Sequence, residues 1–459
     1  MEKVRKILRK VPYVLLALIF VLGIYLRARV YFTNQSFWHD ECALAWNIVN
    51  RDYLELFNPL RFLQVAPPMF LIYTKILVKY LGTSELIFRI VPFVSSLLSV
   101  AMFYFLSKTL FGTKKAILCA SLLFAINFPL YYYSAEFKPY STDVLFCIFT
   151  IYIYQYLNKE SLFLYSAILS TFIWFSFPTA FLISSIGILI LFSRHYKIKE
   201  KITFFTPMLI SGLAFYFCYF QKVFEIQNKG MTTYWNNEFV NIDNYLKIFQ
   251  NANSFIFSPE YILPILMLVG LITYFYERSK FALFSILTLA IIIITSALHL
   301  YPFSGRLILF LIPIAILLVV KPIDVRKFYI GYVFLTIFLY GAYPQFENTF
   351  NAIVKNNFYK NNSTPREMAK YLKTTIKKDD VVFVNINSNS DYLYYKQIYN
   401  ITNKELIESP QFIKKGTKVW FFLPNNAKYT YEKDIKNKYK IYYHNTHGNS
   451  GLLYGIKIR

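Results

Sequence analysis

Two carboxylates stand side by side near the amino end of the sequence, in the segment 37–41, FWHDE. Carboxylates can take a proton from a reacting group or contribute oxygen ligands to a cation. Adjacent acids are equally common in solvated loops, where Asp40 could cap a helix over residues 42–49. Asp40 and Glu41 are therefore candidates for chemistry, with a solvated loop start as the alternative.

A second acidic segment covers residues 131–143, YYYSAEFKPYSTD. If a helix begins early in this segment, Glu136, Tyr140 and Asp143 share one face at spacings of four and seven residues. Asp143 would then lie inside an apolar span near its end, where an ionisable group is a functional hypothesis by default. The alternative is a carboxylate that reaches the membrane surface or pairs with Lys138.

Two cations complete the set of candidate residues. Lys75 follows the segment 64–68, QVAPP, and could attract a lipid phosphate, although a lone lysine there can simply reach toward water. Arg306 ends the segment 299–306, HLYPFSGR, and its guanidinium matches the geometry of a phosphate. An anchor at the membrane surface explains Arg306 equally well.

The elements that carry these residues are membrane helices, because 56% of the 459 residues are hydrophobic and only 16% are charged. We expect an α-helical polytopic membrane protein with an uncleaved first helix. Apolar runs separated by basic clusters predict eleven spans, near residues 11–30, 89–108, 116–134, 140–157, 161–177, 179–193, 203–220, 260–276, 281–298, 305–320 and 328–344.

The distribution of lysine and arginine predicts which side each loop occupies. With a cytoplasmic N-terminus in the inner (plasma) membrane, the basic clusters after every second span all fall inside, as the positive-inside rule requires. The short segment 67–81 then lies along the outer interface as an amphipathic helix. Residues 31–88 form a first outer loop and residues 221–259 a second, so all the candidate residues lie on the outer side.

After residue 344 the sequence becomes polar and rich in lysine. The segment from Thr364 to Glu367 predicts a capping box with proline at the first helical position, opening a helix to about Lys377. Short apolar runs predict strands at residues 381–385, 418–423, 440–443 and 452–458. Residues 345–459 are therefore expected to form a small extracytoplasmic α/β domain, separate from a membrane domain over residues 1–344.

The order of these motifs over residues 1–320 resembles the C-type glycosyltransferases, and more narrowly the protein O-mannosyltransferase and lipid A aminoarabinose transferase superfamily. The resemblance rests on HDE after the first span, APP with a later lysine and then Ser84-Glu85 and Arg89, YYYSAEFKPYSTD, and YPFSGR before an apolar run. Two positions depart from the pattern. Lys138 replaces an arginine, which weakens a phosphate fork, and Ala66 stands where many relatives have histidine.

The resemblance implies an integral membrane glycosyltransferase that takes a sugar from a polyprenyl-phosphate donor in the lipid bilayer. The acceptor would be a lipid, a polysaccharide or a protein. Asp40 matches the acid that acts as a general base or positions the acceptor, and Glu41 would assist it. A divalent cation, Mg or Mn, could bind Asp40 and Glu41, and Asp143 matches a third catalytic acid. Substrate-binding residues would be His39, Lys75, Glu136, Lys138, Tyr140, Tyr301 and Arg306.

Three other functions remain open. A membrane glycan polymerase or ligase that uses a polyprenyl-diphosphate carrier differs only in its donor. A transporter would place functional charges near the membrane midplane, and a scaffold would carry only a binding domain. The net charge of +24 accompanies an excess of Lys, Asn, Ile, Tyr and Phe that is typical of an AT-rich genome, so no nucleic-acid partner is expected. Four scattered cysteines predict single thiols, without a zinc site or a disulfide framework.

Overall fold

In a computed structural model the chain folds as two compact units, each built from separate parts of the sequence. The first, the helical unit, comprises Met1–Phe32, Val65–Tyr73 and Arg89–Phe358. The second, the loop-and-tail unit, comprises Thr33–Gln64, Thr74–Phe88 and Tyr359–Arg459. The structure describes residues 2–257, 261–325, 328–355, 364–384, 389–406, 414–424, 435, 438–447 and 450–458.

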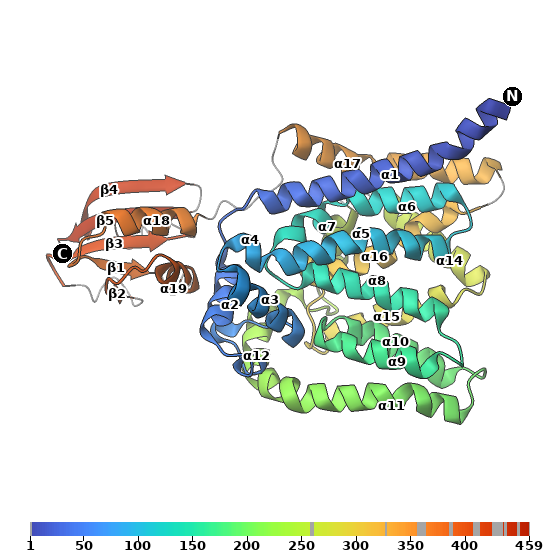
Figure 1. Cartoon of the computed structure of the whole chain (residues 1–459), viewed down its shortest axis with the longest axis horizontal. Helices are drawn as coiled ribbons and strands as arrows, with labels where there is room; N and C mark the ends of the chain where they lie inside the picture. The colour runs from blue at the N-terminus through green and yellow to red at the C-terminus, as the bar shows by residue number, and fades with distance from the viewer. Residues whose placement is uncertain are drawn as a thin grey trace. The chain divides into compact units, whose positions relative to one another are not determined.

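Long apolar helices build the helical unit (Figure 1). Its helices are α1 (Glu2–Phe32), α5 (Ile90–Leu110), α6 (Lys114–Ile126), α7 (Phe128–Tyr132), α8 (Tyr140–Tyr156), α9 (Leu162–Thr171), α10 (Thr179–Phe192), α11 (Ile198–Phe215), α12 (Gln221–Tyr234), α13 (Tyr245–Phe257), α14 (Ile262–Tyr276), α15 (Lys280–Ala297), α16 (Ile312–Val320) and α17 (Phe328–Val354). Helix α3 (Pro68–Leu81) belongs partly to each unit. It confirms the helix predicted over residues 67–81.

Several of these helices are long and apolar enough to cross a membrane. Among the described residues, five pass this test alone, namely Lys10–Phe32, Ile90–Leu110, Ile198–Phe224, Lys280–Ala297 and Gly305–Ile323. Two bent pairs of helices bring the number to seven if each pair is one span. The predicted polytopic helical protein is confirmed, whereas the count of eleven spans stays a prediction.

A buried arginine ties the first helix to a break in the chain between α6 and α7. Helix α1 packs against α5 and α6 (Figure 1). The side chain of Arg27 donates hydrogen bonds to Ser96 Oγ at 2.8 Å, Gly23 O at 3.0 Å and Ala125 O at 3.2 Å. Because the last carbonyls of a helix lack partners within it, the guanidinium satisfies one of them where α6 ends and the chain bends by 54°.

The centre of the helical unit is the segment formed by the 3₁₀ helix η7 (Gly305–Leu311) and α16. Apart from Arg306 the segment is apolar on all sides, and 89% of its span is buried, as expected of a helix surrounded by protein. The segment packs against α14 and α8. After α16, Asp324 accepts hydrogen bonds from the backbone N–H groups of Gly112 at 3.0 Å and Thr113 at 2.8 Å. These bonds fix the turn between α5 and α6.

The loop-and-tail unit joins the segments around α2 (His39–Asn50) and α4 (Glu85–Phe88) to a small α/β fold. The elements of that fold are α18 (Pro365–Thr375), β1 (Val381–Val384), α19 (Asn389–Ile398), β2 (Glu405–Leu406), β3 (Lys418–Leu423), β4 (Tyr439–His447) and β5 (Ser450–Lys457). The strand order is β2-β1-β3-β5-β4. Strand β1 is parallel to β2 and β3, and β5 is antiparallel to β3 and β4.

The structure confirms all four predicted strands and the helix that opens at Pro365. The two-residue strand β2 was not predicted, because so short a run has no alternation to detect. One detail of the capping box is wrong, since the side chain of Thr364 makes no capping hydrogen bond to the first turn of α18. The backbone N–H of Arg366 instead donates to Ser36 Oγ at 3.0 Å. A residue from the first loop thus supplies the acceptor at this helix start.

Candidate functional site

The predicted residues of the second acidic segment all lie in the helical unit, but not on one helix face. Helix α8 begins at Tyr140, and Pro139 is its N-cap residue. Glu136 follows the short 3₁₀ helix η3 (Tyr133–Ala135) in an extended conformation. The shared helix face predicted for Glu136 is therefore wrong, because residues 136–139 form a turn between two helices. Only Tyr140 and Asp143 share a face of α8.

These charged side chains are almost completely buried. Relative exposure is 3% for Glu136, 6% for Lys138 and 8% for Asp143. Lysine and the acidic residues rarely reach this degree of burial unless they interact with other groups. Asp143 lies in the first turn of α8, where the positive end of the helix dipole favours a carboxylate. The burial of Asp143 does not fit the alternative of a carboxylate that reaches out to the membrane surface.

Arg306 joins the segment because η7 packs against α8. The guanidinium carbon of Arg306 lies 5.8 Å from the centre of the Tyr140 ring and 5.8 Å from the centre of the Trp235 ring. A cation within about 6 Å of a ring face is attracted by it. Trp235 was not predicted from the sequence, since nothing in its own segment marks it.

Tyr301 lies in the loop that leads to η7, and its hydroxyl donates to Leu307 O at 2.7 Å. Burial raises the pKa of the Tyr301 hydroxyl well above its ordinary value, and the neighbouring Asp143 and Tyr140 raise it further. The hydroxyl therefore stays protonated at physiological pH. The structure thus brings together four predicted residues, Tyr140, Asp143, Tyr301 and Arg306, which we call the arginine cluster.

The first acidic pair lies at the start of α2 in the loop-and-tail unit. Helix α2 begins at His39, three residues before the predicted start, so Asp40 and Glu41 occupy its first turn. Glu41 is completely buried and its carboxylate accepts a hydrogen bond from the Trp38 backbone N–H at 3.3 Å. The capping function proposed for Asp40 is therefore wrong, because Trp38 is the N-cap residue and Asp40 lies within the helix. Asp40 is partly exposed.

His39 lies beside a carboxylate that the sequence did not single out. Its Nδ1 atom is 3.0 Å from Ser390 Oγ and 3.5 Å from Asp391 Oδ2, both on α19. Asp391 is completely buried, and this burial raises the pKa of its carboxyl, although His39 acts in the opposite direction. The only sequence signal for Asp391 is an acid within the otherwise apolar and aromatic run DYLYY.

Lys75 contacts the C-terminal part of α2 and the residues after it. Its Nζ donates to Ile48 O at 2.9 Å and lies 5.6 Å from the centre of the Tyr53 ring. Burial lowers the pKa of Lys75, and the charges of Asp52 and Glu55 partly offset this effect. Lys75 therefore helps to fix the loop-and-tail unit, and a role in binding phosphate stays a prediction.

A divalent cation needs several oxygen, nitrogen or sulfur ligands at one place. Within the described ranges, no group of three or more His, Cys, Asp or Glu side chains is arranged to hold a metal ion. Asp40 and Glu41 offer two carboxylates, one of which already accepts the Trp38 bond. Magnesium takes six oxygen ligands, several of them water. This donor set is too small to derive a catalytic step through a metal, so the cation stays a prediction.

Comparison with known proteins gives the fold a context. Residues 65–219 match the family described as dolichyl-phosphate-mannose-protein mannosyltransferase. No curated protein matches the chain. The chain resembles the apo crystal structure of ArnT from Cupriavidus metallidurans, with a TM-score of 0.60 at 10% identity over 95% of this chain and 97% of that one.

Two further solved structures are similar. ArnT from Cupriavidus metallidurans bound to undecaprenyl phosphate gives a TM-score of 0.55 at 9% identity, over 96% of this chain and 97% of that chain. The second is the oligosaccharyltransferase AglB from Archaeoglobus fulgidus, in complex with an inhibitory peptide and a dolichol-phosphate. Its TM-score is 0.52 at 10% identity, over 96% of this chain and 74% of that chain. At such identities the likeness shows the fold. Together with the family match, it confirms the resemblance drawn from the sequence.

Proposed function

We propose that this chain, a membrane protein of the C-type glycosyltransferase superfamily, transfers a sugar from a polyprenyl-phosphate carrier to an acceptor on the outer face of the cytoplasmic membrane. The observation that carries the proposal is the arginine cluster, in which the Arg306 guanidinium lies against the rings of Tyr140 and Trp235, while Tyr140 shares a face of α8 with the buried Asp143. The undecaprenyl phosphate and dolichol-phosphate bound by two proteins of similar fold support the choice of donor.

Arg306 is the residue that we assign to the phosphate of the carrier. A guanidinium offers two parallel N–H donors that fit two phosphate oxygens. The sugar phosphate already carries a good leaving group, so the enzyme must chiefly stabilise the charge that develops on the departing phosphate. Lys138, buried in the same segment as Tyr140, would add a second positive charge. Lys75 is assigned a weaker part at the lipid surface.

Asp40 is the residue that we assign to the acceptor. An acceptor hydroxyl is a poor nucleophile until a base takes its proton, and a positioned carboxylate contributes about 10²–10⁴-fold in rate. Asp40 is partly exposed at the first turn of α2, whereas Glu41 is engaged with the Trp38 backbone. Glu41 would therefore assist by fixing the helix start. His39 is assigned to binding the acceptor.

The reaction that follows is a single displacement. The acceptor oxygen attacks the anomeric carbon, its proton passes to Asp40, and the bond from that carbon to the phosphate oxygen breaks. The released carrier keeps its phosphate, and the configuration at the anomeric carbon inverts. Positive charge develops on the sugar as the bond breaks. We assign Asp143 to stabilising that charge, with Glu136, Tyr140 and Tyr301 binding the sugar.

A test of the donor class separates this proposal from its alternatives. Purified protein in nanodiscs is given a cell-envelope extract as the source of acceptor and a panel of undecaprenyl-phosphate hexoses and pentoses, and release of undecaprenyl phosphate is measured by mass spectrometry. The same protein is given an undecaprenyl-diphosphate glycan. Release of undecaprenyl phosphate from at least one monophosphate donor is expected. Consumption of the diphosphate donor alone would instead support a polymerase or ligase.

A separate experiment identifies the acceptor as a lipid, a polysaccharide or a protein. Mass spectrometry of surface glycans from a strain that lacks the chain should reveal one glycoconjugate missing a single sugar. A strain with unchanged envelope glycans, in which a sugar accumulates on one side of the membrane, would support a transporter.

A further inference from the structure

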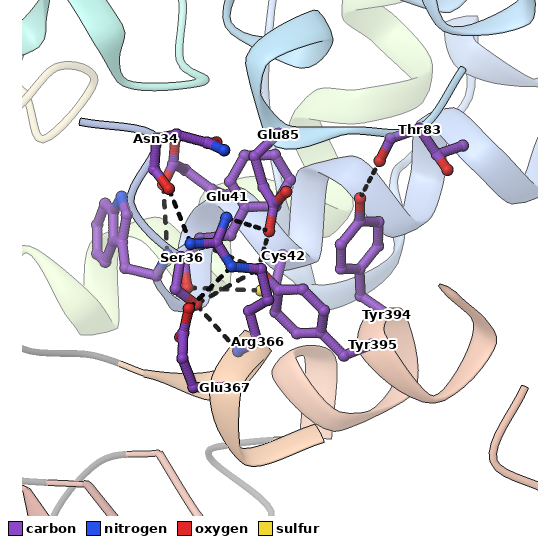
Figure 2. Close-up of polar contacts among 12 residues, drawn as sticks. Asn34, Ser36, Glu41, Cys42, Thr83, Glu85, Arg366, Glu367, Tyr394 and Tyr395 are labelled. Carbon is purple, nitrogen blue, oxygen red and sulfur yellow. Dashed lines mark hydrogen bonds and ion pairs between the residues drawn. The ribbon is translucent and has the colours of Figure 1, made fainter. Parts of the chain in front are cut away.

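The stretch of chain before α2 is held by side chains from the C-terminal part of the sequence. We call residues 33–38 the entry segment, because the chain passes through it into the helix that carries Asp40. It contains no regular secondary structure after Thr33, and Asn34 has a positive φ of 44°. Backbone in this region must be stabilised from outside, and Figure 2 shows α18 and α19 residues around it.

Tyr395 makes the central contact. Its hydroxyl accepts a hydrogen bond from the backbone N–H of Phe37 at 3.0 Å and donates one to Glu85 Oε1 at 2.9 Å (Figure 2). Phe37 directly precedes Trp38, the N-cap residue of α2. One side chain therefore binds the backbone of the entry segment and also connects it to α4.

Arg366 binds the same segment at two other points. Its Nη2 donates to Asn34 O at 2.8 Å, and its backbone N–H donates to Ser36 Oγ at 3.0 Å (Figure 2). Its Nη1 lies 3.3 Å from Glu85 Oε1, so both anchors meet on one buried carboxylate. Glu85 is 8% exposed and Tyr395 only 1%, which places these bonds away from competing water.

The protonation of these groups suits a permanent connection. Burial raises the pKa of the Tyr395 hydroxyl well above its ordinary value, and the neighbouring Cys42 and Glu85 raise it further, so the hydroxyl remains a donor. Burial lowers the pKa of Arg366, but the charges of Glu85 and Glu367 outweigh this effect and raise it. Tyr395 therefore stays neutral and Arg366 stays positively charged at physiological pH.

We propose that Tyr395 and Arg366 are positioning residues that set the direction in which α2 begins, and thereby the placement of the Asp40 carboxylate. This inference rests on the role of Asp40 proposed above. Ser390 makes two further contacts with the same helix start. Its Oγ atom lies 3.0 Å from His39 Nδ1 and 3.4 Å from His39 O. The C-terminal part of the chain thus completes the catalytic loop, in addition to any role in binding an acceptor.

The effect on rate follows from the geometry that proton transfer needs. A misplacement of about 1 Å at a catalytic group can cost about 100-fold in rate. Losing the Tyr395 hydroxyl leaves the Phe37 N–H without its acceptor in a buried place, so the entry segment must move to find another. Binding of the donor involves the arginine cluster, whose residues belong to the helical unit. The expected loss is therefore in turnover and not in donor affinity.

The test compares two neighbouring tyrosines on α19. Tyr395→Phe removes the hydroxyl that binds the entry segment. Tyr394→Phe is the matched control, because it removes a hydroxyl that donates to Thr83 O at 3.3 Å (Figure 2). For Tyr395→Phe we expect kcat to fall at least ~10-fold with KM for the donor within about twofold, because only positioning is lost. Tyr394→Phe should retain both constants within about twofold. Equal kcat values in the two variants would overturn the proposal.

Backbone hydrogen exchange provides a readout that does not depend on sugar transfer. Residues 33–42 should exchange faster in Tyr395→Phe than in Tyr394→Phe, whereas β3 and β5 should keep their protection in both. If the wild-type protein transferred no sugar from any undecaprenyl-phosphate donor, the proposed function would fail while exchange still decided whether Tyr395 orders the segment. Unchanged exchange in residues 33–42 would refute the positioning role by itself.

Arg366 gives a second variant in case Tyr395→Phe folds poorly. Arg366→Lys keeps the positive charge beside Glu85 but offers its donors from a single nitrogen, whereas the guanidinium reaches Asn34 O and Glu85 from two separate nitrogens. Lower kcat with unchanged midpoint temperature is expected, together with faster exchange of residues 33–42. A variant that is as active as the wild type would show that the entry segment needs no such anchor.

Discussion

Arg306 is the single side chain on which the proposed binding of the donor depends most. Its guanidinium lies beside Tyr140 and Trp235, and a lysine at this position would keep the charge but lose the planar fork. We expect Arg306→Lys to weaken binding of undecaprenyl phosphate about 10-fold, and Arg306→Ala about 100-fold, in line with roughly 1.5–3 kcal/mol for a charged hydrogen bond.

Binding of undecaprenyl phosphate to protein in nanodiscs measures this effect. The control is Arg194→Lys, since Arg194 is exposed in the turn between α10 and α11. Arg194→Lys should bind the carrier as the wild type does. If all three variants bound it with wild-type affinity, Arg306 would be an anchor at the membrane surface and not a phosphate ligand.

The buried carboxyl of Asp391 makes the free energy of unfolding depend on pH, and its burial determines the sign of that dependence. Burial raises its pKa above the ordinary value of about 4, so the folded state holds the proton more tightly than the unfolded chain. Stability is therefore lost as pH rises from about 4 through the raised pKa. Asp391→Asn removes this loss. The midpoint temperature of the variant relative to the wild type should increase between about pH 4 and pH 7.

Thermal unfolding in detergent over this pH range measures the difference. The relevant control is Asp379→Asn, which removes an exposed carboxylate near the end of α18. A difference for Asp391→Asn that shrinks as pH rises would contradict the account. It would mean that the pair with His39 stabilises the ionised carboxylate more than burial penalises it.

At the scale of single elements, α8 shows that the residues just before a helix are harder to predict from the sequence than the helix itself. The span predicted near residues 140–157 matches α8, but a helix that begins early enough to include Glu136 does not form, because residues 136–139 turn before Tyr140. Helix α2 shows the opposite error, since it begins at His39 and not at Cys42. Local propensity locates helices well and their first residues poorly, because the first turn is set by partners distant in sequence.

The contacts of the entry segment could not have been predicted for the same reason. Tyr395 and Phe37 are separated by 358 positions along the chain. The local sequence of each segment correctly predicts a helix for one and a loop for the other. Neither local sequence indicates that the two segments contact each other. The apolar spans and the strands of the tail depend on local patterns and were predicted, whereas the pairing of distant polar groups depends on the folded structure.

Arg27 predicts how the break between α6 and α7 is stabilised. Its guanidinium binds carbonyls of α1 and α6 and the hydroxyl of Ser96, all buried. Arg27→Leu would leave Ala125 O without its donor, which costs about 1–3 kcal/mol. We expect a lower midpoint temperature in detergent. Ser96→Ala loses one bond and should lower it less, and an Arg27→Leu protein as stable as the wild type would contradict this account.

At the scale of the whole molecule, the residues assigned to the reaction are divided between the two compact units. The helical unit carries the arginine cluster, Glu136 and Lys138, and the loop-and-tail unit carries Lys75 and the HDE segment. The sequence predicted a boundary after residue 344, at the end of the last span. Contacts in the structure group residues 33–64 and 74–88 with residues 359–459. A single boundary along the sequence cannot describe a unit that is built from three separate segments.

The central claim is that Asp40 takes the proton of an acceptor while a polyprenyl phosphate leaves. The most direct test is the rate of sugar transfer by purified Asp40→Asn, with Asp379→Asn as a control for a charge lost from an exposed carboxylate. Asparagine keeps the shape of aspartate but cannot accept the proton, so transfer should fall at least ~100-fold. Expression, membrane insertion and binding of undecaprenyl phosphate should stay at wild-type levels. Normal turnover by Asp40→Asn would contradict the account.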